Sequence, residues 1–231
     1  GYTVGTSATP TPRTGQHPRL LFTNDDLPGI RAYLKANPTA EQTLKQQVNN
    51  CISSLGVLSL PEATGTEETI SNYSAIVCQQ IQAAAFYYRV TGIEYYGYIA
   101  ILSMKNNLKT FSLAKYYSDQ CRYFGYTAYT AACVYDWCYD LLTKADKEQL
   151  TLGVEYKLFR GMSVGEYLLV DSEGNVTETV KVARGGAKME IGFPPSGQNS
   201  VSGHGAEHQL LRDYIAFSIA IYDENPSWYT Y

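Results

Sequence analysis

Apolar side chains recur every three to four residues along most of this chain, which is the spacing of an amphipathic helix. The clearest example covers residues 71–90, and Thr91-Gly92 ends it. The same period predicts further helices at about residues 23–37, 39–52, 93–105, 113–142, 144–158 and 204–222. Because the links between them are short, consecutive helices are expected to pair antiparallel.

One stretch departs from the helical pattern. Residues 171–175 are rich in turn formers, and residues 176–182 alternate polar and apolar side chains as a half-buried strand does. We therefore expect a mainly all-α fold with a small β-hairpin insertion near residues 170–190. Periodicity alone leaves open whether the helical pairs form a bundle, a solenoid or a toroid.

The length of 231 residues is that of one domain. Residues 1–16 are rich in Thr, Pro and Gly and show no periodicity, so we expect a disordered lead-in followed by a domain over residues 17–231. Such a lead-in is typical of a chain whose signal peptide has been removed, which favours export. The net charge of −4 is dispersed without a Lys/Arg block, so a nucleic-acid partner is not expected. No apolar run is long enough to span a bilayer, and nothing implies a cofactor.

Tyrosine is the distinctive residue of the composition, with 21 Tyr against 7 Phe and 2 Trp. A Tyr ring offers a flat stacking face and a hydroxyl, which suits a sugar-binding surface. Tyr129, Tyr135 and Trp137 on the predicted central helix are candidates for lining a sugar cleft, with core packing as the alternative. The five cysteines lack zinc-type CxxC spacing and fall mostly on apolar helix faces, so we expect reduced, structural thiols.

The chemistry of the chain concentrates in residues 198–208, which hold two of its three histidines. On a helix, His204, Glu207 and His208 stand at i, i+3 and i+4 and so share one face. An imidazole titrates near neutral pH and can act as a general base. Two imidazoles beside a carboxyl group therefore indicate either proton transfer or a metal.

Three segments, in this order, resemble the heparinase II/III-like polysaccharide lyases. They are HPRLLFT at 17–23, ACVYDWCYDLL at 132–142, and SGHGAEH at 202–208 with an aliphatic helix and YDENP at 222–226. The resemblance implies an incomplete (α/α) toroid built from antiparallel helical hairpins. It also implies β-elimination on an acidic, uronic-acid-containing polysaccharide by an exported bacterial enzyme, in the extracellular space or the periplasm.

The resemblance also implies roles for single residues. His204 and Glu207 match the catalytic His-x-x-Glu element of these lyases. The family's catalytic Tyr and a further His come from later segments, so residues 17–231 are expected to be the N-terminal part of a toroid that is inactive alone.

β-Elimination needs the substrate carboxylate to be stabilised before a carbon-bound proton is removed. Gln198 and Asn199 are candidates for that contact, His204 for the base, and His208 for supporting it. Arg184, in the loop before the site, is a candidate for binding the anionic sugar chain.

Other classes of protein stay open. HGAEH also fits the HxxEH pattern of inverted zinc peptidases, in which both histidines bind zinc, but only Glu224 follows as a possible third acidic ligand. A non-catalytic glycan-binding helical domain would keep the aromatic residues without the His/Glu pair. A glycoside hydrolase would need two carboxylates flanking a cleft, for which Asp136, Asp140 and Glu207 are candidates.

Overall fold

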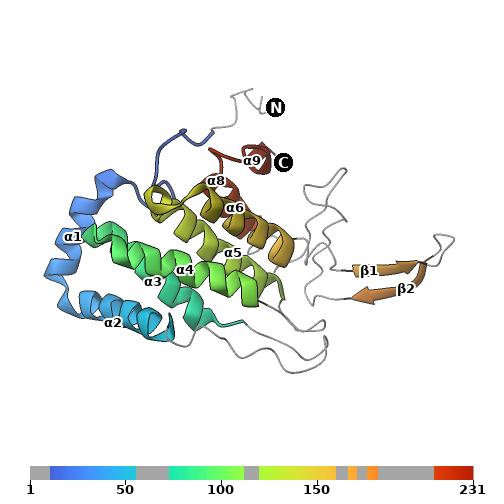
Figure 1. Ribbon diagram of the computed structural model, residues 1–231, viewed down its shortest axis with the longest axis horizontal. Coiled ribbons are helices and arrows are strands. Elements are labelled where there is room, and N and C mark those ends of the chain that lie inside the picture. Colours follow the sequence, from blue (N-terminus) through green and yellow to red (C-terminus); the bar gives the residue numbers. More distant parts are fainter. Residues whose placement is uncertain are drawn as a thin grey trace, which may run out of the picture.

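The computed structural model describes residues 11–55, 73–111, 120–159, 166–170, 176–181 and 211–230. These residues are mostly helical, which confirms the mainly all-α prediction (Figure 1). The longer helices are α1 (Leu27–Ala36), α2 (Pro38–Leu55), α3 (Ala75–Thr91), α4 (Glu94–Thr110), α5 (Gln120–Trp137), α6 (Lys144–Gly153) and α8 (Leu211–Ala220). Shorter elements are η1 (Asn24–Asp26), η2 (Tyr139–Leu141), the π-helical η3 (Val154–Phe159) and α9 (Ser227–Thr230).

Local sequence signals set several helix ends. The Ser74 side chain accepts a hydrogen bond from the Val77 N–H and caps α3, which ends at Gly92 with a φ of 72°. Thr143 and Asp146 form the predicted capping box at the start of α6. The helix predicted for residues 113–142 is shorter at its C-terminal end, because α5 stops at Trp137 and η2 follows.

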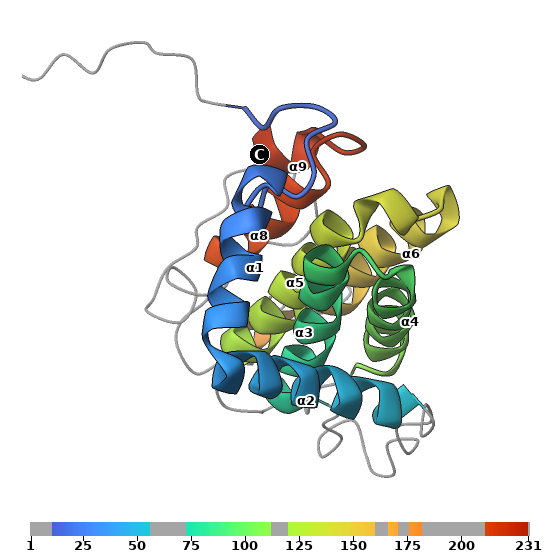
Figure 2. The ribbon, with the colours of Figure 1, turned by 90° about the vertical axis from the view of Figure 1, so that its left-hand side faces the viewer.

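Helix α5 is the centre of the packing. It contacts α3 on one side and α8 on another, while α3 also packs against α2 and α4 (Figure 2). The two-residue link between α3 and α4 makes them an antiparallel pair, as the sequence predicts. The largest fully buried side chains include Tyr135, Phe217, Ile81, Met104 and Leu150.

Burial agrees with the role expected for the thiols. Cys51, Cys78, Cys133 and Cys138 are all buried and free. Burial raises the pKa of each of them, so they stay protonated and pack as small apolar groups.

Strands β1 (Glu166–Val170) and β2 (Val176–Lys181) pair antiparallel, with Glu166 opposite Lys181. The sequence placed a hairpin near residues 170–190; this pair begins four residues earlier, and residues 182–190 lie outside the described part of the chain.

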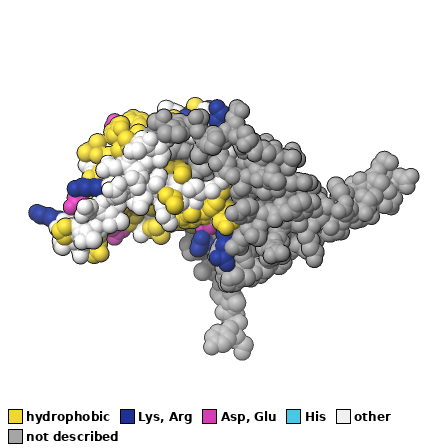
Figure 3. All heavy atoms as spheres, turned by 90° about the horizontal axis from the view of Figure 1, so that it is seen from below, with side chains coloured by type: hydrophobic (Ala, Val, Ile, Leu, Met, Phe, Trp, Pro, Cys, Tyr) yellow, Lys and Arg dark blue, Asp and Glu magenta, His cyan; other side chains and the backbone are white. Residues whose placement is uncertain are grey.

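The described surface mixes polar side chains with patches of hydrophobic ones, as the face in Figure 3 shows. Leu102 and Leu152 are among the large hydrophobic residues that are about half exposed. Among the described helices, none combines the length and the apolar character that crossing a membrane requires.

Gly97 on α4 tests how closely the helices pack. A Cβ there would clash with Leu141 Cδ1 and would lie 3.1 Å from Tyr88 Cγ, whereas a Cβ at Gly29 on α1 would meet nothing within 4 Å. We expect Gly97→Ala to lower the free energy of unfolding by about 1–2 kcal/mol, because overpacking outweighs the gain in helix propensity. Gly29→Ala is the matched control and should leave stability unchanged or raise it by up to about 1 kcal/mol. Urea denaturation measures both, and equal effects of the two changes would contradict the packing described for α4.

Candidate functional site

Six of the residues proposed from the sequence lie outside the described part of the chain. They are Arg184, Gln198, Asn199, His204, Glu207 and His208. Their roles stay predictions. The three aromatic candidates, Tyr129, Tyr135 and Trp137, all lie on α5 and are described.

Trp137 is a core residue. It is 5% exposed, its Nε1–H donates to the Leu20 carbonyl oxygen at 3.1 Å, and its ring lies 5.4 Å from that of Phe22. An indole enclosed in this way leaves no face for a sugar. Core packing, the alternative set against sugar contact, is therefore the role that these contacts give Trp137.

Tyr135 is also buried, but its hydroxyl reaches a polar pocket. It donates to Glu224 Oε2 at 2.9 Å, and both residues line a pocket of about 390 Å³ beside α6. Burial and the adjacent Glu224 raise the pKa of Tyr135. The neutral Tyr135 hydroxyl therefore donates a hydrogen bond that fixes Glu224. The buried Tyr135 ring leaves no face exposed for a sugar.

Tyr129 is the aromatic candidate whose surroundings best fit a ligand. It is half-buried, and its ring is nearly parallel to that of Tyr126, at 13° and 6.5 Å between centroids. Burial, the Cys133 thiol and the charge of Asp213 raise the pKa of Tyr129, so its hydroxyl stays neutral.

An exposed cation belongs to the same neighbourhood. Arg212 on the first turn of α8 pairs with Asp213 through two contacts, Nε to Oδ1 at 2.7 Å and Nη2 to Oδ2 at 3.0 Å. The Asp213 carboxylate is buried and the Arg212 guanidinium is largely exposed. Tyr126, Tyr129 and Arg212 thus combine an aromatic strip with an oriented cation, and we refer to them as the Tyr129 face.

A second polar assembly ties the N-terminal segment to the core. His17 Nδ1 lies 2.7 Å from Asp136 Oδ1, and His17 Nε2 lies 2.7 Å from Asp223 Oδ2. Arg19 Nη2 donates to the same Asp223 oxygen at 2.7 Å. We call His17, Arg19, Asp136 and Asp223 the His17 cluster.

Arg19 adds a further contact to the His17 ring. Its Nη2 lies 2.9 Å from His17 Nε2, so a carboxylate oxygen of Asp223 and the Arg19 guanidinium both approach that nitrogen. The side chains of His17, Arg19, Asp136 and Asp223 are all at most 7% exposed, so the cluster is a buried polar assembly.

Both carboxylate oxygens of Asp136 are engaged within the His17 cluster. Its Oδ2 accepts the backbone N–H groups of Arg19 and Leu20, each at 2.8 Å, while its Oδ1 faces His17. Its side chain is 0% exposed. The glycoside hydrolase alternative needs two carboxyl groups that flank a cleft, and this buried position rules out Asp136 as one of them.

Glu224 is held next to the cluster. Its Oε1 accepts the Tyr139 hydroxyl at 2.5 Å and Lys147 Nζ at 2.7 Å, in addition to the Tyr135 contact at Oε2. Burial raises the pKa of Glu224, but the hydrogen bonds from Lys147, Tyr139 and Tyr135 lower it by more, so the carboxylate stays ionised.

The position of Glu224 bears on the zinc alternative, in which it was the possible third acidic ligand. Both of its oxygens are occupied by side-chain donors. Within the described residues, no group of three or more His, Cys, Asp or Glu side chains is arranged to hold a metal ion. His204 and His208 lie outside those residues, so zinc binding there stays untested.

Tyr139 links the His17 cluster to Glu224 and Lys147. Its ring stacks on His17 with 3.6 Å between centroids and 7° between planes, and Lys147 Nζ lies 3.7 Å from its centroid. The Lys147 ammonium over this electron-rich ring is a favourable cation–π contact, and the His17 ring stacks on the same Tyr139 ring.

The sequence did not predict these partners. His17 is 119 residues from Asp136 and 206 residues from Asp223. One signal was present, because Asp136 is an acidic residue within an otherwise apolar helical stretch. The structure brings together residues 17–22, 132–142 and 222–226, which belong to the three segments that carry the lyase resemblance.

Comparison with protein-family models and with curated proteins returns no match for this chain. Membership of a family is therefore not established. The functional argument consequently depends on the residues and their geometry.

Asp136 provides the test of the His17 cluster. Asp136→Asn should lower the free energy of unfolding by about 3–5 kcal/mol, because it removes a buried negative charge and leaves one acceptor oxygen where two served His17 and the Arg19 and Leu20 amides. Asp25→Asn is the matched control, since Asp25 lies exposed on η1. The control should cost about 1 kcal/mol or less. Urea denaturation gives the stabilities, and hydrogen exchange should show loss of protection at the Arg19 and Leu20 amides in Asp136→Asn only. A loss no larger than that of the control would contradict a buried ionic cluster.

Glu224 predicts how stability depends on pH. Its folded-state pKa is lowered, so its contribution is present above the ordinary value of about 4.3 and is lost as the pH falls through the folded-state value. Glu224→Gln should therefore reduce stability at pH 7 and flatten the decline between about pH 5 and pH 3. The exposed Glu148→Gln, on α6 at the same pocket, should follow the wild-type curve. Urea midpoints measured across this pH range are the readout, and a Glu224→Gln curve parallel to wild type would argue against the shift.

Proposed function

We propose that this chain is the front part of an (α/α) toroid and belongs to a polysaccharide lyase that cleaves an acidic, uronic-acid-containing glycan by β-elimination. The observation that carries the proposal is that described parts of the three resembling segments, residues 17–22, 132–142 and 222–226, meet at the His17 cluster and the neighbouring Trp137. If the similarity of the three stretches were due to chance, there would be no reason for them to be in contact. A fold shared with the lyases explains the contact, because each stretch then supplies part of one packing unit.

The arrangement of helices supports the same proposal. Antiparallel pairing of α3 with α4, and packing of both α3 and α8 on α5, are what successive hairpins of a toroid require. Leu211 begins α8 three residues after His208 in sequence, and the first turn of α8 carries Arg212 and Asp213 beside Tyr129. The proposed catalytic segment therefore leads directly into the helix that completes the Tyr129 face.

The proposed chemistry assigns each group one task. Asn199 and Gln198 hold the substrate carboxylate, so that negative charge developing on the adjacent carbon is stabilised. His204 removes the carbon-bound proton, with Glu207 beside it. The acid that protonates the leaving glycosidic oxygen is a Tyr that this chain does not assign. Arg184 and the Tyr129 face bind the neighbouring sugar units, and the enzyme acts outside the cytoplasm, in the extracellular space or the periplasm.

A second candidate function has its own support. The Tyr129 face joins aromatic rings to an exposed guanidinium, and that combination binds carboxylated sugars without any need for His204. A non-catalytic glycan-binding domain is therefore the alternative, and it predicts binding without any new product.

His204→Ala tests the lyase proposal. With the protein in its longest natural form, the unsaturated uronyl product should appear as a rise in ultraviolet absorbance on hyaluronan, chondroitin, heparan sulfate or alginate. His204→Ala should lower that rate by about 10²–10⁴-fold without changing the melting temperature, because it removes a general base. His208→Ala is the matched control and should cost much less, since His208 has a supporting role.

The same pair of variants separates the other candidates. Stoichiometric zinc that is lost equally in His204→Ala and His208→Ala would favour the peptidase. Glycan binding without product on any of the four substrates would favour the binding domain. Either outcome would overturn the lyase proposal.

A further inference from the structure

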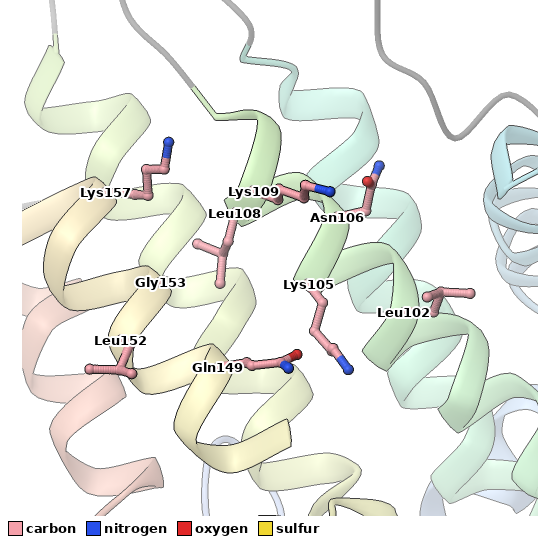
Figure 4. Close-up of a pocket in the computed structure, with 9 residues that line it drawn as sticks. All are labelled: Leu102, Lys105, Asn106, Leu108, Lys109, Gln149, Leu152, Gly153 and Lys157. Atoms are coloured by element: carbon pink, nitrogen blue, oxygen red, sulfur yellow. The ribbon is translucent and has the colours of Figure 1, made fainter. Parts of the chain in front are cut away.

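A groove of about 520 Å³ lies between the C-terminal half of α4 and the consecutive elements α6 and η3 (Figure 4). Its base is formed where Leu108 meets Gly153, and a Cβ at Gly153 would come within 2.9 Å of Leu108 Cδ1. The missing side chain lets the two walls approach at the base. Leu102 and Leu152, on opposite walls, are 49% and 50% exposed, so apolar surface remains open to solvent on both sides.

The charged side chains among the described residues that line this groove are all lysines. Lys105, Lys109 and Lys157 line it, and none of the other described residues lining it carries a carboxylate. Lys105 is paired with Asp146 at 2.7 Å. Lys109 and Lys157 are exposed, and neither has an ion pair within the described part of the chain. Figure 4 shows these two lysines on opposite walls at the same end of the groove.

The local charge is unexpected for this protein, whose net charge is −4. Two exposed lysines without an ion pair in the described part of the chain, one on each wall of the groove, make the local potential positive, which favours an anionic ligand. The uncharged polar groups of the lining are the amides of Asn106 and Gln149. Together the five polar side chains form a lining rich in hydrogen-bond donors, which fits a ligand rich in acceptors.

We infer that this groove is a second binding site for an acidic glycan, and that it shares no residue with the proposed lyase centre. The inference rests on the proposed function for the identity of the polymer. Sugar carboxylates would pair with Lys109 and Lys157, hydroxyls would meet Asn106 and Gln149, and the C–H faces of the sugar rings would cover Leu102 and Leu152. An acidic protein segment is the competing occupant, but its side chains accept mainly through carboxylates, whereas a glycan also offers closely spaced hydroxyl and ether oxygens to the amides of Asn106 and Gln149.

Fluorescence anisotropy with a labelled hyaluronan oligosaccharide tests the inference, using the protein in its longest natural form. Lys109→Glu/Lys157→Glu should weaken binding at least about tenfold, a change of about 1.4 kcal/mol. Arg13→Glu/Lys35→Glu is the matched control, because it makes the same charge change at exposed positions on other elements and should alter binding little. Leu102→Ser should weaken binding by a smaller factor, and raising the salt concentration should weaken wild-type binding.

Three results would overturn the inference. They are unchanged binding in Lys109→Glu/Lys157→Glu, equal binding of a neutral cello-oligosaccharide, and lysine-dependent binding of a poly-glutamate peptide but not of hyaluronan. The lyase proposal fails separately. Binding that depends on Lys109 and Lys157, without cleavage of any acidic glycan, would contradict the lyase proposal and support the glycan-binding groove. Cleavage that depends on His204, with binding unaffected by changes at both lysines, would support the lyase proposal and contradict the glycan-binding groove.

Discussion

The fold of the described residues depends on one bridging side chain, the buried His17. Its two ring nitrogens join Asp136 near the end of α5 to Asp223 just after α8, each at 2.7 Å. Among the described residues of the N-terminal segment, His17 hydrogen-bonds to both carboxylates through one ring. Removing either carboxylate leaves buried donors without their acceptor, and such losses are among the largest that a single substitution causes. The ionic arrangement therefore specifies the position of residues 17–20 more sharply than apolar packing alone would.

The cluster also explains why its neighbours are aromatic. The His17 ring stacks on Tyr139, and Lys147 lies over the same Tyr139 ring at 3.7 Å from its centroid. Lys147 is in turn fixed by Glu224, which follows Asp223 directly in the chain. Two adjacent acidic residues after α8 thus hold the two groups that pack on Tyr139, Asp223 holding His17 and Glu224 holding Lys147. This coupling fixes α6 and the C-terminal end of α8 relative to α5 through side chains alone.

The parts of this structure that the sequence predicted are those governed by local signals. The helical period, the Thr143–Asp146 capping box and the stop at Gly92 all concern residues within a few positions of each other. The His17 cluster escaped prediction, because its members are brought together only by tertiary packing. The sequence could not decide between core packing and sugar contact for Trp137, for a related reason. Helix α5 is buried on nearly all sides, with polar Thr127 and Thr130 also 0% exposed, so no amphipathic stripe distinguishes a core-facing from a cleft-facing side chain.

The two ends of α5 consequently have different chemical characters. Near its C-terminal end the buried Asp136 has each oxygen satisfied, and it is enclosed away from solvent. Toward the middle of α5 the buried Asp213 of α8 is matched mainly by the exposed Arg212, and burial raises the pKa of Asp213 even though Arg212 opposes the shift. A buried carboxylate paired with one solvent-exposed cation is stabilised less than a buried carboxylate surrounded by hydrogen-bond donors. An anion arriving at Arg212 would compete for that guanidinium, so ligand binding and the protonation of Asp213 are coupled at the Tyr129 face. The His17 cluster has no such exposed member in its first contacts, which is why we assign structure to the C-terminal end of α5 and ligand chemistry to its middle.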